Sequence, residues 1–167
     1  NTKFNGVHMT AFYSYLHLDA TDSNIHTNTG PGIYLRAQSS KIPEYLACPT
    51  GNMLDAKACN LYGNAKHGIS LNVEEDGIVG GAMHHPNGQS LLKDGGNVNY
   101  SVDFGQGSVN SCAISNNGKA GIYFNLKNTG GHNFPSYACI RFTNSIIWNN
   151  AGGGYLADLT GNATNPY

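Results

Sequence analysis

The stretch Ile25-His26-Thr27-Asn28-Thr29-Gly30-Pro31-Gly32-Ile33-Tyr34-Leu35 decides the fold, because its pattern returns three more times along the chain. Each copy reads apolar, two spacers, Asn, three spacers, Gly, apolar, spacer, apolar. The other full copies cover 61–71, 114–124 and 147–157, and a partial copy covers 6–9. The repeated residues are Asn28, Asn64, Asn117 and Asn150, followed by Gly32, Gly68, Gly121 and Gly154. Such an internal repeat outweighs other sequence signals, because it describes the architecture of the whole chain.

The residues after each repeated glycine predict a β-strand. In 68–71 the apolar residues are spaced by two, which places them on one face of a strand. The preceding Asn tolerates the left-handed conformation and can hydrogen-bond nearby backbone, and Gly avoids a Cβ clash at the strand entry. Successive glycines, counted from Gly6, are 26, 36, 53 and 33 residues apart, which is too far for hairpins. Each copy therefore predicts one coil of a solenoid, about 4.8 Å from the next coil.

Stacked coils predict two ladders of inward side chains, which would form the core. The first ladder is Val7, Ile33, Ile69, Ile122 and Tyr155, and the second is Met9, Leu35, Leu71, Phe124 and Ala157. The long gaps between copies predict insertions at about 73–96, 38–51 and 128–135. The segment 11–18 alternates loosely, so it is interpreted as a strand or a short packing segment.

The repeat resembles the right-handed parallel β-helix of the pectin-lyase-like superfamily. The segments 112–122 and 144–150 are similar to the turn consensus of that superfamily, and the resemblance covers roughly 5–159. It implies an all-β, right-handed parallel β-helix of about five turns with loop insertions, as one domain over 1–167. The superfamily includes polysaccharide lyases, polygalacturonases, phage tailspikes and many surface proteins, so the fold alone does not identify the activity.

Composition narrows the class of protein. Charged residues are 11% of the 167 residues and the net charge is −1, so a nucleic-acid partner is not expected without clustered Lys and Arg. No apolar stretch approaches the roughly 20 residues of a membrane span. A surface covered by Asn, Ser, Thr and Tyr is typical of an extracellular or surface-exposed protein.

Four cysteines, Cys48, Cys59, Cys112 and Cys139, are disulfide candidates with three possible pairings. Cys59 and Cys112 each lie nine residues before their glycine, so we expect them in contact in adjacent coils. They form either a disulfide or two stacked buried thiols. The alternative is the sequential pairing Cys48–Cys59 and Cys112–Cys139. An even cysteine count favours an oxidising compartment.

Outward residues of the glycine-led strands predict a glycan-binding face, because Tyr and His rings stack on sugars while Asn and Arg supply hydrogen bonds. An ordinary solvent-facing surface is the alternative. The candidates for glycan contact are His8, Tyr34, Arg36, Ser70, Asn72, Tyr123, Asn125 and Asp158.

The sequence supports a catalytic function less well than it supports glycan binding. Glycoside hydrolysis needs two carboxylates about 5 to 9.5 Å apart, and the expected face offers Asp158 alone. Lys66-His67-Gly68 resembles the His-Gly part of the polygalacturonase motif, without the paired Asp before it. We assign no catalytic residue, no cofactor and no metal site. A polysaccharide lyase or hydrolase stays an alternative to glycan binding.

A structural role is the other alternative. Neither chain end shows an amphipathic capping helix, and an uncapped solenoid exposes strand edges and core side chains. We therefore expect a fragment of a longer solenoid, or self-association or attachment through the solenoid ends, as in a filament, fibre or adhesin subunit.

Overall fold

The computed structural model describes residues 4–12, 15–38, 50–74, 77–79, 108–128, 136–138, 140–161 and 163–164. Within these ranges every regular element is a β-strand, and every strand pair is parallel. The all-β class predicted from the sequence is therefore confirmed.

The strands form three parallel sheets. Sheet A contains β1 (Val7–Phe12), β4 (Ile33–Gln38), β7 (Ile69–Glu74), β11 (Ile122–Asn128) and β15 (Tyr155–Gly161). Sheet B contains β2 (Tyr15–Thr21), β5 (Thr50–Lys57), β8 (Gly77–Val79), β9 (Ser108–Asn110), β12 (Ser136–Ala138), β13 (Arg141–Thr143) and β16 (Ala163–Thr164). Sheet C contains β3 (Asn24–His26), β6 (Asn60–Tyr62), β10 (Ala113–Ser115) and β14 (Ile146–Trp148).

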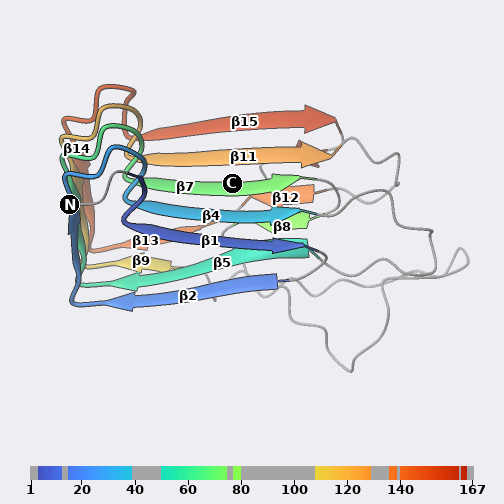
Figure 1. Cartoon of the computed structure of the whole chain (residues 1–167), viewed down its shortest axis with the longest axis horizontal. Helices are drawn as coiled ribbons and strands as arrows, with labels where there is room; N and C mark the ends of the chain where they lie inside the picture. Colours follow the sequence, from blue (N-terminus) through green and yellow to red (C-terminus); the bar gives the residue numbers. More distant parts are fainter. Residues whose placement is uncertain are drawn as a thin grey trace, which may run out of the picture.

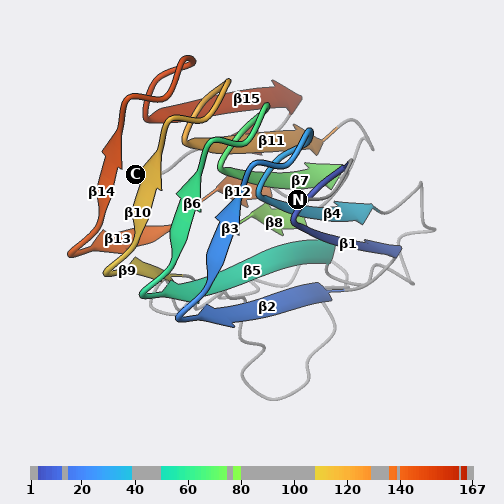
Figure 2. The ribbon, with the colours of Figure 1, turned by 60° about the vertical axis from the view of Figure 1, so that its left-hand side comes forward.

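The chain visits sheet A, then sheet B, then sheet C, and returns to sheet A one strand further along. Figure 1 shows the strands of sheet A stacked in sequence order from β1 to β15. Figure 2 shows sheet C beside sheets A and B, so that the three sheets form the sides of a prism. Buried side chains from all three sheets join one hydrophobic core, including Leu35 of sheet A, Leu54 of sheet B and Leu61 of sheet C.

The register predicted for sheet A is confirmed strand by strand. Val7 pairs with Ile33, which pairs with Ile69, and the ladder continues to Ile122 and Tyr155. The middle of this ladder is fully buried, and Tyr155 continues the ladder at its end, where it is 45% exposed. It lies on β15, the edge strand of the sheet, and one side of its ring packs against Phe124 at 5.3 Å between centroids.

The repeated asparagines form a hydrogen-bonded ladder between sheets C and A. The Nδ2 of Asn28 donates to Oδ1 of Asn64 at 2.8 Å, Asn64 donates likewise to Asn117 at 2.9 Å, and Asn117 to Asn150 at 2.8 Å. Each accepting Oδ1 also takes the backbone N–H of the preceding ladder residue. These amides are buried in the first three coils, and their mutual bonding offsets the cost of removing them from water.

The repeated glycines allow close contact between neighbouring coils. A Cβ on Gly68 would lie 2.6 Å from Cγ2 of Ile114 and 2.7 Å from the carbonyl oxygen of Gly121. Gly154, in the same column at the edge of the sheet, has open space apart from an ordinary 3.6 Å contact with Ile147. The close approach of neighbouring coils therefore explains why the inner positions of this column require glycine.

The left-handed conformation belongs to the residue before each ladder asparagine, and not to the asparagine itself as the sequence suggested. These residues have φ between 49° and 62°: they are Thr27, Gly63, Asn116 and Asn149. A second left-handed residue bends the chain between sheets B and C: these are Asp22, Ala58, Ser111 and Asn144. Positive φ at such regular positions turns the chain without a long loop.

A second ladder of small polar side chains follows the corner between sheets B and C. Its members are Ser23, Cys59, Cys112 and Ser145, and each donates to the carbonyl two residues earlier at 2.9 to 3.3 Å. Between coils, the backbone N–H of Cys59 donates to Sγ of Cys112 at 3.4 Å, and that of Cys112 to Oγ of Ser145 at 3.0 Å. The thiols therefore occupy positions that hydroxyl groups fill in the outer coils.

The predicted contact between Cys59 and Cys112 is confirmed, as buried free thiols. Neither residue forms a disulfide in the structure, and each sulfur lies within hydrogen-bond distance of backbone carbonyls. Cys48 and Cys139 lie outside the described residues.

The structure also locates the segment 11–18 and parts of the predicted insertions. Within the segment 11–18, residues 11–12 belong to β1 and residues 15–18 belong to β2, while 13–14 lie outside the described residues. The insertion at 73–96 contains the end of β7 and the short strand β8, while most of it, and most of the insertions at 38–51 and 128–135, lies outside the described residues. The described part of the chain contains no helix that could cross a membrane.

Candidate functional site

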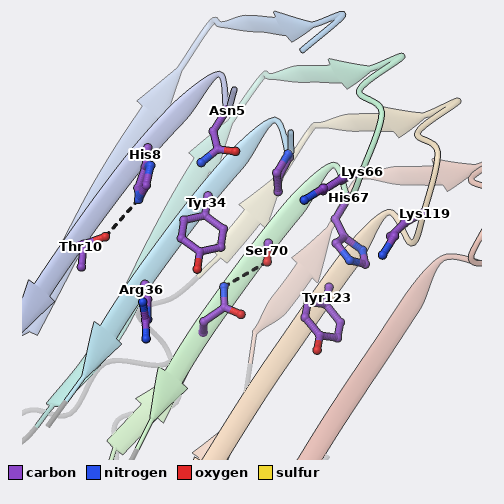
Figure 3. Close-up of a pocket in the computed structure, with 12 residues that line it drawn as sticks. Asn5, His8, Thr10, Tyr34, Arg36, Lys66, His67, Ser70, Lys119 and Tyr123 are labelled. Atoms are coloured by element: carbon purple, nitrogen blue, oxygen red, sulfur yellow. Dashed lines mark hydrogen bonds between the residues drawn. The ribbon is translucent and has the colours of Figure 1, made fainter. Parts of the chain in front are cut away.

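A groove of about 510 Å³ crosses the outward face of sheet A. Strands β1, β4, β7 and β11 each contribute side chains to it, as do the turns that enter these strands (Figure 3). Its lining residues are Asn5, His8, Thr10, Pro31, Tyr34, Arg36, Lys66, His67, Ser70, Asn72, Lys119 and Tyr123. Six of the eight residues predicted to contact glycan are in this list.

One register column explains the shape of the groove. His8, Tyr34, Ser70 and Tyr123 lie side by side on neighbouring strands. Two interstrand spacings separate the backbones of Tyr34 and Tyr123 by about 9.6 Å. Because the residue between them is the small Ser70, the two rings stand as walls above a low floor (Figure 3).

Ser70 and Asn72 form that floor. They are 3% and 6% exposed, and the Nδ2 of Asn72 donates to Oγ of Ser70 at 3.0 Å and to the carbonyl of Leu35 at 3.3 Å. The amide hydrogens of Asn72 are thus already engaged within the protein. This residue shapes the groove and offers little surface to a ligand, which differs from the contact role expected for it.

Aromatic and imidazole rings line the groove in two contact pairs. The ring of His67 stacks on Tyr123, with 4.5 Å between centroids and 12° between planes. His8 meets Tyr34 edge to face at 4.9 Å, and its Nε2 lies 3.1 Å from Oγ1 of Thr10. These contacts fix the orientation of the rings before any ligand arrives.

The charged residues that line the groove are all basic. Arg36 pairs with Glu74 at 3.0 Å, so its charge is largely balanced. Lys66 and Lys119 are exposed at the rim, and neither forms an ion pair with any residue the structure describes. None of the lining residues is an Asp or a Glu. A concave surface with unbalanced cations and no carboxylate of its own attracts anions.

The pKa values of His67 and Tyr123, at one end of the groove, are shifted from their ordinary values. Burial, together with the nearby charge of Lys119, lowers the pKa of His67 below 6.5, which favours the neutral imidazole. Burial also raises the pKa of Tyr123 to about 12, and the hydrogen bond from its hydroxyl to Asp158 at 2.6 Å acts in the same direction. Tyr123 is therefore a neutral ring whose hydroxyl donates to Asp158.

Two predicted contact residues lie beyond the groove. Asn125 and Asp158 continue the column that contains Arg36 and Asn72, as the sequence predicted, but neither lines the groove. Asp158 acts on the site indirectly, because it accepts the hydrogen bond of Tyr123.

Sequence reasoning did not predict ligand contacts for the turn residues Asn5, Pro31, Lys66, His67 and Lys119, although it noted the resemblance of Lys66 and His67 to part of the polygalacturonase motif. The signal was present in the repeat: His67 directly precedes a repeated glycine, and Lys66 and Lys119 each stand two residues before one. These rim residues lie in turns, so a prediction based only on outward strand positions did not include them. A comparison with protein-family models, curated proteins and solved structures found no match for the chain.

Proposed function

We propose that the chain is a right-handed parallel β-helix of about five coils, similar to the pectin-lyase-like superfamily. The parallel pairing, the order in which the chain visits the three sheets, and the asparagine ladder support this assignment. Within such a fold, we propose that the face of sheet A binds a polysaccharide outside the cell.

The groove over β1, β4, β7 and β11 is the observation that carries this proposal. Tyr34 and Tyr123 offer ring faces and edges to pyranose rings, which prefer aromatic partners for their C–H faces. The run of the groove across several strands suits an extended chain of sugars. Arg36 and the two rim lysines add hydrogen-bond donors for hydroxyl or acidic groups.

The charge balance favours a glycan that carries carboxylate or sulfate groups. Lys66 and Lys119 face the groove without ion-pair partners among the described residues. Binding without hydrolysis is favoured over a glycosidase, because such an enzyme needs two carboxylates flanking the scissile bond and the lining residues offer none.

The experiment is a glycan array with the purified chain, followed by calorimetric titration of any glycan that binds. Tyr34→Ala together with Tyr123→Ala should weaken binding by about tenfold or more, because each ring contributes on the order of 1 kcal/mol. Tyr62→Ala is the matched control, since Tyr62 is an exposed tyrosine on sheet C. Unchanged affinity in a folded double variant would remove the proposal.

Self-association is a second candidate, supported by exposed apolar side chains around the last strands. Ile146, Trp148, Tyr155 and Leu156 are 43% to 57% exposed, and β14 and β15 are edge strands of their sheets in the described part of the chain. Parallel edges that expose apolar residues can pair with another chain. Leu156→Lys should lower the particle size measured by light scattering, whereas a wild-type chain that is monomeric at high concentration would exclude this candidate.

A further inference from the structure

A histidine and two aspartates converge on sheet B, away from the sheet A groove. His17 and Asp19 lie on β2, and Asp55 lies on the neighbouring strand β5. They alternate with the buried Leu16, Ala20 and Leu54, so they share the outward face of the sheet. The Nε2 of His17 lies 3.2 Å from Oδ2 of Asp55 and 3.5 Å from Oδ1 of Asp19.

The register makes this arrangement costly unless a positive charge offsets the two carboxylates. Asp19 and Asp55 are direct partners in the parallel pair of β2 and β5, and like charges placed opposite each other destabilise a sheet. No Lys or Arg among the described residues forms an ion pair with either carboxylate, although Lys57 is two residues from Asp55. Both carboxylates instead face one imidazole nitrogen, which carries at most one hydrogen.

The spacing of the three ligand atoms fits a bound metal ion. Ligand atoms about 2.1 Å from a zinc ion lie about 3.0 to 3.4 Å from one another in octahedral or tetrahedral geometry. The two distances from Nε2 are close to this range, and all three atoms lie within 4.8 Å of one another. The Asp19 side chain is 75% exposed, so it is free of packing that would hold it away from the other two ligand atoms.

One ligand is already oriented by a neighbouring coil. The Oγ of Ser108, on β9, donates to Oδ1 of Asp55 at 3.0 Å and leaves Oδ2 directed toward His17. Hydrogen bonds of this kind to a ligating carboxylate fix its direction and raise metal affinity. The cluster is therefore more ordered than three independent surface side chains.

We propose that His17, Asp19 and Asp55 bind a divalent transition-metal ion, with Zn²⁺ as the reference ion. One imidazole nitrogen with two carboxylate oxygens suits Zn²⁺ and related ions, whereas Mg²⁺ and Ca²⁺ prefer oxygen ligands throughout. The bound ion neutralises the facing carboxylates and links β2 to β5, so it stabilises the first two coils against each other.

The test uses the chelator-treated, tag-free chain, titrated with Zn²⁺ by calorimetry and followed by thermal melting. The wild type should bind Zn²⁺ and melt at a higher temperature as Zn²⁺ is added. His17→Gln and Asp55→Asn should each lower Zn²⁺ affinity by about tenfold or more. Asp22→Asn, which replaces an exposed aspartate outside the cluster, should keep the wild-type affinity.

A second readout separates metal binding from a structural role of the cluster. Without metal, Asp55→Asn should melt at or slightly above the wild-type temperature, because it removes one of two facing like charges. In Zn²⁺ it should melt below the wild type. Affinities within twofold of wild type for both His17→Gln and Asp55→Asn, absence of wild-type Zn²⁺ binding at millimolar concentration, or Mg²⁺ binding as tight as Zn²⁺ would each overturn the proposal.

Discussion

At the residue scale, the fold contains a ladder of buried polar side chains. Each of them hydrogen-bonds to the same type of side chain one coil away, which makes the burial tolerable. Asn64 shows this clearly. Its Oδ1 accepts from the backbone and side chain of Asn28, and its Nδ2 donates to Asn117 and to the carbonyl of Ile25. An isolated buried amide would be costly, but a continuous ladder leaves every inner member satisfied.

Replacement of Asn64 by Ala should lower the free energy of unfolding by about 2 to 4 kcal/mol, since it leaves buried groups of Asn28 without partners. Denaturant unfolding followed by circular dichroism measures the change. Asn60→Ala is the control, because Asn60 pairs with Asn24 in a similar amide contact on the exposed face of sheet C. Equal effects of the two substitutions would contradict the importance of the buried ladder.

The imidazole of His67 should make stability depend on pH. Because its folded pKa lies below 6.5, the unfolded chain takes up a proton that the folded chain does not. The stability associated with this residue is therefore present above pH 6.5 and decreases as the pH falls below it toward the lower folded pKa. Melting temperatures of the wild type should decrease more steeply than those of His67→Asn between about pH 7 and pH 5. Parallel curves would show that His67 does not contribute.

At the scale of elements, the corner between sheets B and C and the corner between sheets C and A each combine one left-handed residue per coil with one column of polar side chains. The corner between sheets B and C uses Ser23, Cys59, Cys112 and Ser145 in equivalent positions. These residues stand five positions before the ladder asparagines. The cysteines are thus part of a serine-like column, and burial raises the pKa of the Cys112 thiol, which lowers its reactivity.

This equivalence predicts that Cys112→Ser is better tolerated than Cys112→Ala. Serine can accept from the backbone N–H of Cys59 and donate to the carbonyl of Asn110, as the thiol does. Alanine removes both contacts and should cost about 1 to 3 kcal/mol, while serine should cost less. Thermal melts under reducing conditions compare the two variants, and a serine variant less stable than the alanine variant would be inconsistent with a shared role.

At the scale of the whole molecule, the repeat predicted sheet A well and predicted the other faces poorly. The Asn and Gly columns set the register of β1, β4, β7, β11 and β15, because close contact between coils leaves few residue types for those positions. Sheet B carries no comparable pattern. Strands β2 and β5 pair with an offset of 36 residues, which is also the distance in sequence between Asn28 and Asn64. Applying the offset of the repeated asparagines to the residues of sheet B would therefore have predicted that Asp19 lies beside Asp55.

Part of the groove was predictable because the repeated asparagines and glycines set the register of sheet A. Outward strand positions follow from the register, so the column with Tyr34, Ser70 and Tyr123 was expected. Which of these side chains remain available to a ligand depends on contacts that a one-dimensional pattern does not contain. Asn72 bonds to Ser70, and Tyr123 is held by His67 and Asp158.

The central proposal, a glycan-binding groove on sheet A, is tested most directly by nuclear magnetic resonance of the labelled chain. The chain is titrated with the glycan that binds most tightly on the array, and backbone amide shifts are followed. We predict that the largest shifts cluster at Tyr34, His67, Ser70 and Tyr123 and in the turns that carry Lys66 and Lys119. Saturable shifts confined to sheet B or sheet C, with none in the groove, would contradict the proposal.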